Sequence, residues 1–214
     1  MTDLLESLPA IYPLHFFSLS SDLNYIEEGA EELFKKKFLL PDTSEYLAED
    51  HFADVHMSWN QEGIFLDVGV HKPLEDVLYP DFRKGESIEL FFDTRDLKTA
   101  GFPTKFCHHF VILPQEVQGI RAQEISKFRA EETHPLCDPD EILTEMTPTK
   151  KGFSLRIGIP TSILHGFDPA SFDRLGFTYR INRSAGSPQH FSISSKQYAI
   201  EQQPALWASL KLSR

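Results

Sequence analysis

The chain of 214 residues carries 32 acidic and 21 basic side chains, a formal net charge of −11, and its hydrophobic content of 41%, with 18 Phe, is enough for one sizeable core. A chain this acidic repels phosphate backbones, so we expect no nucleic-acid partner. No stretch reaches the roughly 18 apolar residues of a membrane-spanning helix, so we expect no membrane partner either.

The first residues lack the marks of a secretory leader. The stretch MTDLLESLPAIYPLHFF has no basic start, no long apolar run and no small-residue cleavage site. Two cysteines, Cys107 and Cys137, are too few for a disulfide framework. We therefore expect a cytoplasmic protein.

The best helical pattern lies in residues 22–37, where Asp22 is placed to cap the first turn. The apolar positions repeat at helical spacing and would form one stripe, made of Leu23, Ile26, Ala30 and Phe34. Three lysines at 35–37 would lie at the C-terminal end, which suits the helix dipole. The sequence thus predicts an N-terminal extension, residues 1–50, that contains one helix.

Alternation of apolar and polar residues predicts short strands along the rest of the chain. Two of them, 53–60 and 64–71, flank a short Gly-containing turn, which is a hairpin signal. The other predicted strands are 87–94, 105–114, 152–160, 175–183, 190–195 and 206–212. Short strands with one apolar face, separated by Gly and Pro, favour an antiparallel sandwich. We expect one all-β domain over 1–214, with the sandwich at 51–214 after the N-terminal helical extension.

Two segments interrupt this pattern. Residues 115–149 are acidic and broken by prolines, so we expect them to form a long connection across the sandwich. Residues 160–167 predict a single helical turn, because Pro160 suits the first turn of a helix and Gly166 suits its end.

The order of the motifs resembles that of carbohydrate-binding module family 9. The motifs are VHMSWNQEGIFLDVGVHKP, GESIELFFDTRDLKTAGF, KKGFSLRIGIPTSIL, LGFTYRINRSAG and PALWASLKL, and together they span residues 53–214. The resemblance implies a β-sandwich of the kind that is shared with the DOMON group of sugar-binding and haem-binding modules. It also implies non-catalytic binding of a carbohydrate.

The resemblance points to particular side chains. Glu89 matches a family Glu on the sheet face that receives sugar, and Asn182 matches a family Asn. The family holds its sugar between two Trp side chains, whose positions fall near Phe82-Arg83 and near Glu201 here, so neither is Trp. We expect Tyr79 and Phe82, which lie on the same loop, to substitute in part for these Trp side chains.

Strand parity adds two basic residues to this candidate site. Arg156 and Arg180 lie on the non-core side of their strands, and if those strands are neighbours they share one face with Glu89. The candidate ligand-binding residues are Phe82, Glu89, Arg156, Arg180 and Asn182. A solvated sheet face with cross-strand charge pairs is the alternative. Trp59 and Trp207 match positions where the family keeps core aromatic residues.

Other chemistry finds little support. No catalytic motif is present, so we expect no enzyme. Zinc-type donors occur in one set, Cys107, His109, His134 and Cys137, but their spacing matches no standard zinc site, and we expect no metal and no cofactor. Met57 fits the core better than a haem site. The sequence therefore predicts a binding module for a carbohydrate or similar polar ligand, or alternatively a protein–protein interaction module on a relic sugar-binding scaffold.

Overall fold

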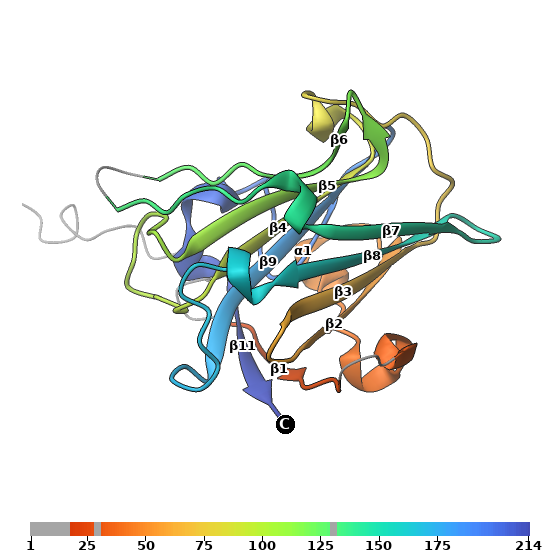
Figure 1. The fold of residues 1–214 in the computed structure, drawn as a ribbon. Coiled ribbons are helices and arrows are strands. Elements are labelled where there is room, and N and C mark those ends of the chain that lie inside the picture. Colours follow the sequence, from red (N-terminus) through yellow and green to blue (C-terminus); the bar gives the residue numbers. More distant parts are fainter. Residues whose placement is uncertain (1–17, 28–30, 129–131) are drawn as a thin grey trace, which may run out of the picture.

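The computed structural model describes residues 18–27, 31–128 and 132–214. The fold of these residues consists mainly of two β-sheets that pack face to face (Figure 1). The larger sheet has the order β1 (Ser20–Asn24), β11 (Ala208–Ser213), β9 (Arg174–Asn182), β4 (Ser87–Asp93), β5 (Cys107–Val117) and β6 (Ile120–Glu124), and β10 (Gln189–His190) also pairs with β9. The smaller sheet has the order β2 (Ala53–Trp59), β3 (Gly63–Val70), β8 (Phe153–Pro160) and β7 (Leu143–Pro148). The predicted all-β sandwich is therefore confirmed.

The core lies between the sheets, where the apolar faces of the alternating strands meet. From the larger sheet, β4 contributes Ile88, Leu90 and Phe92, all of them buried. From the smaller sheet, β2 contributes Val55, Met57 and Trp59. The period of two seen in the sequence thus assigns these side chains to the correct face of each strand.

The single helix predicted for residues 22–37 is not observed, because its first residues form a strand and its second half contains two 3₁₀ turns, Glu31–Phe34 and Lys36–Phe38. Residues 20–24 form β1, which pairs with β11 in a parallel register, and Leu23 is fully buried. The Trp59 side chain reinforces this strand by donating from Nε1 to the Leu23 carbonyl at 2.9 Å. Pairing and burial that come from distant residues therefore override the local helical periodicity. Ala30 lies outside the described residues.

Helical structure elsewhere in the described residues is short. It consists of α1 (Ser44–Leu47) and of 3₁₀ turns at Glu31–Phe34, Lys36–Phe38, Phe82–Lys84, Pro139–Glu141, Thr161–Ile163, Ile200–Gln202 and Pro204–Leu206. The turn at Thr161–Ile163 confirms the helical turn expected in 160–167. Within the described ranges, no helix has the length and apolar character needed to cross a membrane.

The long connection predicted for residues 115–149 is also only partly right. β5 continues to Val117, and the segment then adds an edge strand to each sheet, because β6 pairs with β5 and β7 pairs with β8. β7 shows no buried face, and Leu143 at its start is 59% exposed, so alternation gave no signal there. Conversely, the strand predicted at 190–195 shrinks to the two residues of β10.

Candidate ligand-binding site

Glu89 lies in the middle of β4, on the face of the larger sheet that points away from the main core. Its neighbours across the ladders are Val111 on β5 and Arg180 on β9. Ile88 and Leu90 point to the core, so Glu89 and Phe91 must point the other way. An acidic side chain is therefore held at a fixed place on a central strand.

Four side chains bind the Glu89 carboxylate, and these five residues are called the Glu89 hub. Arg180 donates to both oxygens, from Nε at 2.6 Å and from Nη2 at 2.7 Å. Asn182 donates from Nδ2 at 2.8 Å, the His109 Nε2 lies at 2.9 Å, and Arg83 donates from Nη2 at 3.0 Å. The Glu89 side chain is fully buried, so its lone pairs are satisfied by protein donors.

The charges of the hub fix its protonation states. Burial alone would raise the pKa of Glu89, but hydrogen bonds from His109 and Arg180 outweigh it and hold that pKa well below its ordinary value. Burial lowers the pKa of His109, and the cations Arg83 and Arg180 lower it further against the opposing effect of Glu89. The hub therefore contains an ionised carboxylate, two guanidinium groups and a neutral imidazole that donates from Nε2.

The lowered pKa of Glu89 predicts a loss of stability in acid. The carboxylate is ionised above the pKa of an unfolded Glu, about 4.3, and there the hub contributes its full stability. As the pH falls below this value towards the lower folded pKa, the unfolded chain takes up protons first and the free energy of unfolding decreases.

Urea denaturation between pH 7 and pH 3 measures this dependence. We expect a shallow decrease below about pH 6.5, where the unfolded chain protonates His109 before the folded chain does, and a steep decrease below pH 4, to which the lowered pKa of Glu49 also contributes. The matched control is Glu145→Gln, which removes a carboxylate with a 70% exposed side chain. This change should leave the dependence of the free energy of unfolding on pH unchanged. A free energy of unfolding that stays constant down to pH 3 would contradict the burial of an ionised Glu89.

A pocket of about 460 Å³ lies beside the hub on the same face of the sheet. Its charged rim comes from two loops, because Arg83 Nη2 and Glu201 Oε1 form an ion pair at 3.3 Å across residues far apart in the sequence. Its aromatic lining comes from Phe82, Phe91, Phe128 and Trp207. Phe91 also stacks on the ring of His109, with 4.2 Å between centroids. The pocket therefore combines an apolar wall with a few fixed polar groups, as small-molecule sites usually do.

The structure brings together four of the five predicted site residues. Glu89, Arg180 and Asn182 belong to the hub, and Phe82 lines the adjacent pocket. Arg156 does not join them. It lies on β8 in the smaller sheet, half exposed, with Nε 3.6 Å from an oxygen of Asp67. The expected shared face with Arg156 is wrong, because strand parity gives the side of a sheet and not which sheet a strand joins.

Three ionisable residues of the hub and the pocket rim, Arg83, His109 and Glu201, are absent from the predicted ligand-binding residues. Arg83 and Glu201 lie where the family resemblance places its two Trp side chains. Their opposite charges are the feature of the sequence that could have indicated an ion pair between these two positions. His109 reaches Glu89 only through the register of β5 against β4, which pairs His109 with Phe91. That register depends on contacts between separate strands, so the sequence of either strand alone does not reveal it.

The two tryptophans differ in their surroundings. Trp59 is 2% exposed in the main core, as predicted. Trp207 is also buried, but it belongs to a smaller apolar cluster with Phe91 and Ile200 on the opposite face of the larger sheet. Its Nε1 donates to the Ile200 carbonyl at 2.8 Å, and its ring lines the pocket. Trp207 therefore supports the aromatic wall rather than the main core.

The cysteine and histidine set of residues 107–137 does not gather at one place. Cys107 packs with Phe91 on the face of the hub, and burial raises the pKa of its thiol to about 12. His109 belongs to the hub, whereas His134 and Cys137 both contact Glu124. The division arises because Cys107 and His109 share the hub face of β5, whereas the segment that carries His134 and Cys137 packs beside His108 on the opposite face.

One further cluster has the connectivity of a catalytic triad. The hydroxyl of Ser195 lies 2.8 Å from His190 Nε2, and His190 Nδ1 lies 2.9 Å from Glu49 Oε1. The backbone N–H of Ser195 donates to the same Nε2 at 3.2 Å, so the lone pair that a catalytic base needs is already engaged. The backbone N–H of His190 also donates to Glu49. The cluster therefore fastens the end of α1 to β10.

Three solved structures with a similar fold are two carbohydrate-binding modules and one candidate carbohydrate-binding protein. A family 9 carbohydrate-binding module from Caldicellulosiruptor kristjanssonii in complex with cellotriose has a TM-score of 0.61 at 12% identity, over 91% of this chain and 93% of that chain. A family 9 carbohydrate-binding module from the same organism in complex with glucose has a TM-score of 0.61 at 13% identity, over 91% of this chain and 96% of that chain. A candidate carbohydrate-binding protein from Bacteroides uniformis has a TM-score of 0.53 at 10% identity, over 92% of this chain and all of that chain.

These likenesses show the fold, and they confirm the resemblance to family 9 modules at that level. They give no support to the alternative of a protein-interaction module. The DOMON part of the resemblance stays a prediction. No protein-family profile matches the sequence. No curated protein matches it either.

Proposed function

We propose that this chain is a non-catalytic module that binds a carbohydrate, or a ligand with similar adjacent hydroxyls, in the pocket beside the Glu89 hub. The observation that carries the proposal is the hub itself, a network of buried charges that fixes Arg83 and His109 against an aromatic-lined pocket. The carbohydrate complexes of structures with this fold support it.

The accessible polar groups suit sugar hydroxyls. The side chain of Arg83 is 43% exposed and that of Glu201 is 28% exposed, so one offers fixed donors and the other offers acceptors at the rim. Phe82 lies under this rim, with its ring 5.7 Å from the Arg83 guanidinium carbon. Aromatic rings of this kind pack against the apolar C–H faces of sugars.

The buried members of the hub take a different role. Glu89 and Arg180 are almost completely buried, so they are positioning residues that hold Arg83 and His109 rather than groups that touch ligand directly. Because an ion pair replaces the two Trp of the family, a ligand must share or open the contact between Arg83 and Glu201. We therefore expect weaker binding than at a site where two aromatic rings enclose the sugar.

Titration calorimetry with cellotriose and glucose, followed by a glycan array, tests this proposal. For the sugar that binds, Arg83→Ala and Glu201→Ala should each weaken binding at least about tenfold, since each removes a charged group that contacts it. Arg156→Ala removes the same cation from the other sheet and should leave binding unchanged. If no glycan binds, or if Arg83→Ala binds it as well as the unmodified protein, the pocket is not a carbohydrate site.

A further inference from the structure

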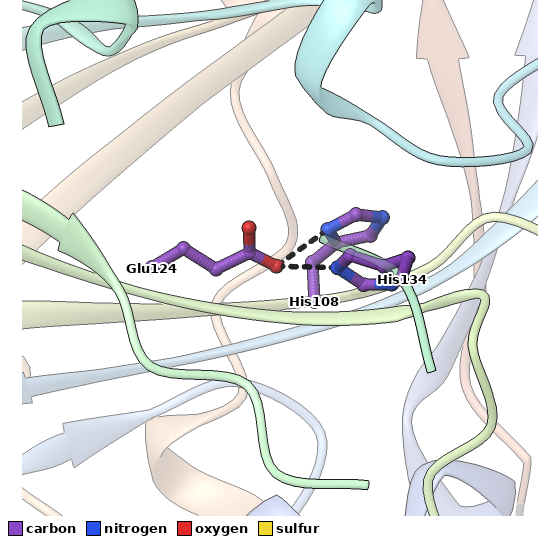
Figure 2. A group of neighbouring side chains, drawn as sticks. All are labelled: His108, Glu124 and His134. Carbon is purple, nitrogen blue, oxygen red and sulfur yellow. Dashed lines mark hydrogen bonds and ion pairs between the residues drawn. The ribbon is translucent and has the colours of Figure 1, made fainter. Parts of the chain in front are cut away.

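A second polar cluster lies on the opposite face of β5 from the Glu89 hub. His108 precedes His109 in the chain, so its side chain points to the other side of the sheet, where it stacks on Phe110. Glu124, the last residue of β6, pairs with Phe110 on the neighbouring strand. His134 reaches the same place from the segment between β6 and β7. Figure 2 shows the two imidazole rings directed at a single oxygen of the Glu124 carboxylate.

We propose that His108, Glu124 and His134 form a binding site for a divalent transition metal ion, with Zn²⁺ the best fit. His108 Nδ1 and His134 Nε2 each lie 2.8 Å from Glu124 Oε1. The three ligand atoms lie within 4.8 Å of one another, and their side chains are at most 1% exposed. Tetrahedral zinc places such ligand atoms about 3.4 Å apart at bond lengths near 2.1 Å, so small shifts of these side chains would accommodate the ion.

Hydrogen bonds around the cluster orient these atoms as metal ligands. His134 Nδ1 lies 2.6 Å from the Lys105 carbonyl, which can only accept, so Nδ1 carries a proton. Nε2 faces a carboxylate oxygen at 2.8 Å, so this contact becomes favourable when Nε2 carries a proton or when a metal cation lies between the two atoms. A ligating histidine that donates its second ring nitrogen to a backbone carbonyl is the usual arrangement around zinc.

The carboxylate and the second histidine point to the same conclusion. Ser126 donates to Glu124 Oε1 at 2.7 Å, and the backbone N–H of Cys137 donates to Oε2 at 3.0 Å, so the carboxylate is held in place. His108 Nε2 is buried without a hydrogen-bond partner. That nitrogen lies on the far side of the ring from Glu124, so it marks no ligand position. The feature that matches a metal site is the convergence of His108 Nδ1 and His134 Nε2 on one oxygen of a carboxylate that is held in place.

The donor set selects the kind of ion. Two imidazoles and one carboxylate suit Zn²⁺, whereas Ca²⁺ and Mg²⁺ prefer oxygen ligands. A small pocket lined by His134, Cys137 and His165 adjoins the cluster and gives a path for the ion and a fourth position for water. The ion would fasten the segment before β7 to β5 and β6. Phe128, which lies 4.6 Å from His134 between ring centroids and lines the larger pocket, would be held with it.

Metal binding to the full chain tests this proposal without any sugar ligand. After treatment with a chelator and dialysis, titration calorimetry with ZnCl₂ should show one site, and Zn²⁺ should raise the melting temperature where CaCl₂ does not. His134→Ala and Glu124→Gln should weaken Zn²⁺ binding by at least about 100-fold, since each removes a ligand and not merely a residue that orients one. His56→Ala, which removes an imidazole from the smaller sheet, should bind Zn²⁺ as the unmodified protein does.

A spectroscopic measurement on the unmodified protein keeps the test valid if a variant fails to fold. Co²⁺ at the site should give the visible absorption of a four-coordinate nitrogen and oxygen site, and Zn²⁺ should displace it at a ratio of one to one. An unmodified chain that binds neither ion overturns the proposal, and so does Zn²⁺ binding that His134→Ala and Glu124→Gln leave unchanged. The cluster would then only hold the segment before β7 against β5 and β6 through hydrogen bonds and ion pairs. Because Arg83 and Glu201 take no part, failure here leaves the proposed carbohydrate site standing.

Discussion

Replacing Glu89 by Gln is expected to lower the free energy of unfolding by about 3–5 kcal/mol, because it leaves a buried cation without its counter-charge. The Arg180 side chain is 7% exposed, and both of its hydrogen bonds to Glu89 are shorter than 2.8 Å. A Gln amide keeps the size of the side chain but offers one acceptor oxygen and no charge. Urea denaturation followed by circular dichroism measures the loss.

The matched control for this change is Glu201→Gln at the rim of the pocket. It makes the same chemical change to a carboxylate that also contacts Arg83, but its side chain is 28% exposed. We expect it to cost no more than about 1 kcal/mol, as ion pairs near the surface usually do. Equal losses for the two variants would show that the hub contributes no more than an ordinary surface pair.

A double-mutant cycle separates the hub from independent packing effects. Once Arg180→Gln has removed the buried cation, Glu89→Gln no longer leaves it unpaired, so the loss in the double variant should be smaller than the sum of the single losses by more than about 1 kcal/mol. Arg83 still contacts residue 89 in both backgrounds, which limits how large this difference becomes. Strictly additive losses would contradict a coupled network.

Trp59→Ala is expected to cost about 3–5 kcal/mol of stability, because it removes a large buried side chain from the main core. The ring is 2% exposed, and it packs edge-on against Tyr25 with centroids 5.2 Å apart. Its Nε1 donates to the carbonyl of Leu23 on β1, so truncation leaves a cavity and also deprives the edge strand of a hydrogen bond. Thermal unfolding and urea denaturation report the loss.

Two companion variants distinguish packing from hydrogen bonding at this position. Trp59→Phe keeps most of the apolar contact but loses the donor, so it should cost about 1–3 kcal/mol, the usual effect of leaving a buried carbonyl unpaired. Tyr46→Ala removes another aromatic ring at a position that is 78% exposed, and it should change stability by no more than about 0.5 kcal/mol. A Trp59→Ala variant as stable as Tyr46→Ala would mean that β1 does not pack as described.

The two polar clusters share an origin in the pleat of one strand. His108 and His109 are adjacent in β5, yet one faces Glu124 and the other faces Glu89. Each histidine meets a carboxylate held on the strand next to it. Because a strand turns its successive side chains to opposite faces, one short motif supplies both a carbohydrate-site candidate and a metal-site candidate. Ser126 links the two, since it accepts from the His109 backbone N–H and donates to Glu124.

The sequence by itself determined what depends on local pattern. Alternation in 87–94 placed Glu89 opposite Ile88 and Leu90, and the structure confirms that arrangement. Alternation likewise located the central strands of both sheets, since these strands must bury one apolar face. Alternation does not predict strands β1, β6 and β7, because they lie at sheet edges and carry polar or mixed residues. Their pairing is stabilised by the neighbouring strands rather than by an apolar face of their own.

Only the tertiary structure decided which side chains meet. Arg156 and Arg180 have the same parity in similar strands, but one strand joins the smaller sheet and the other lies beside β4. Arg83 and Glu201 approach one another because two segments far apart in the sequence come together over the face of the larger sheet that carries Glu89. Sheet membership and register are set by backbone pairing and core packing across the whole chain, and a period of two within one strand carries no information about either.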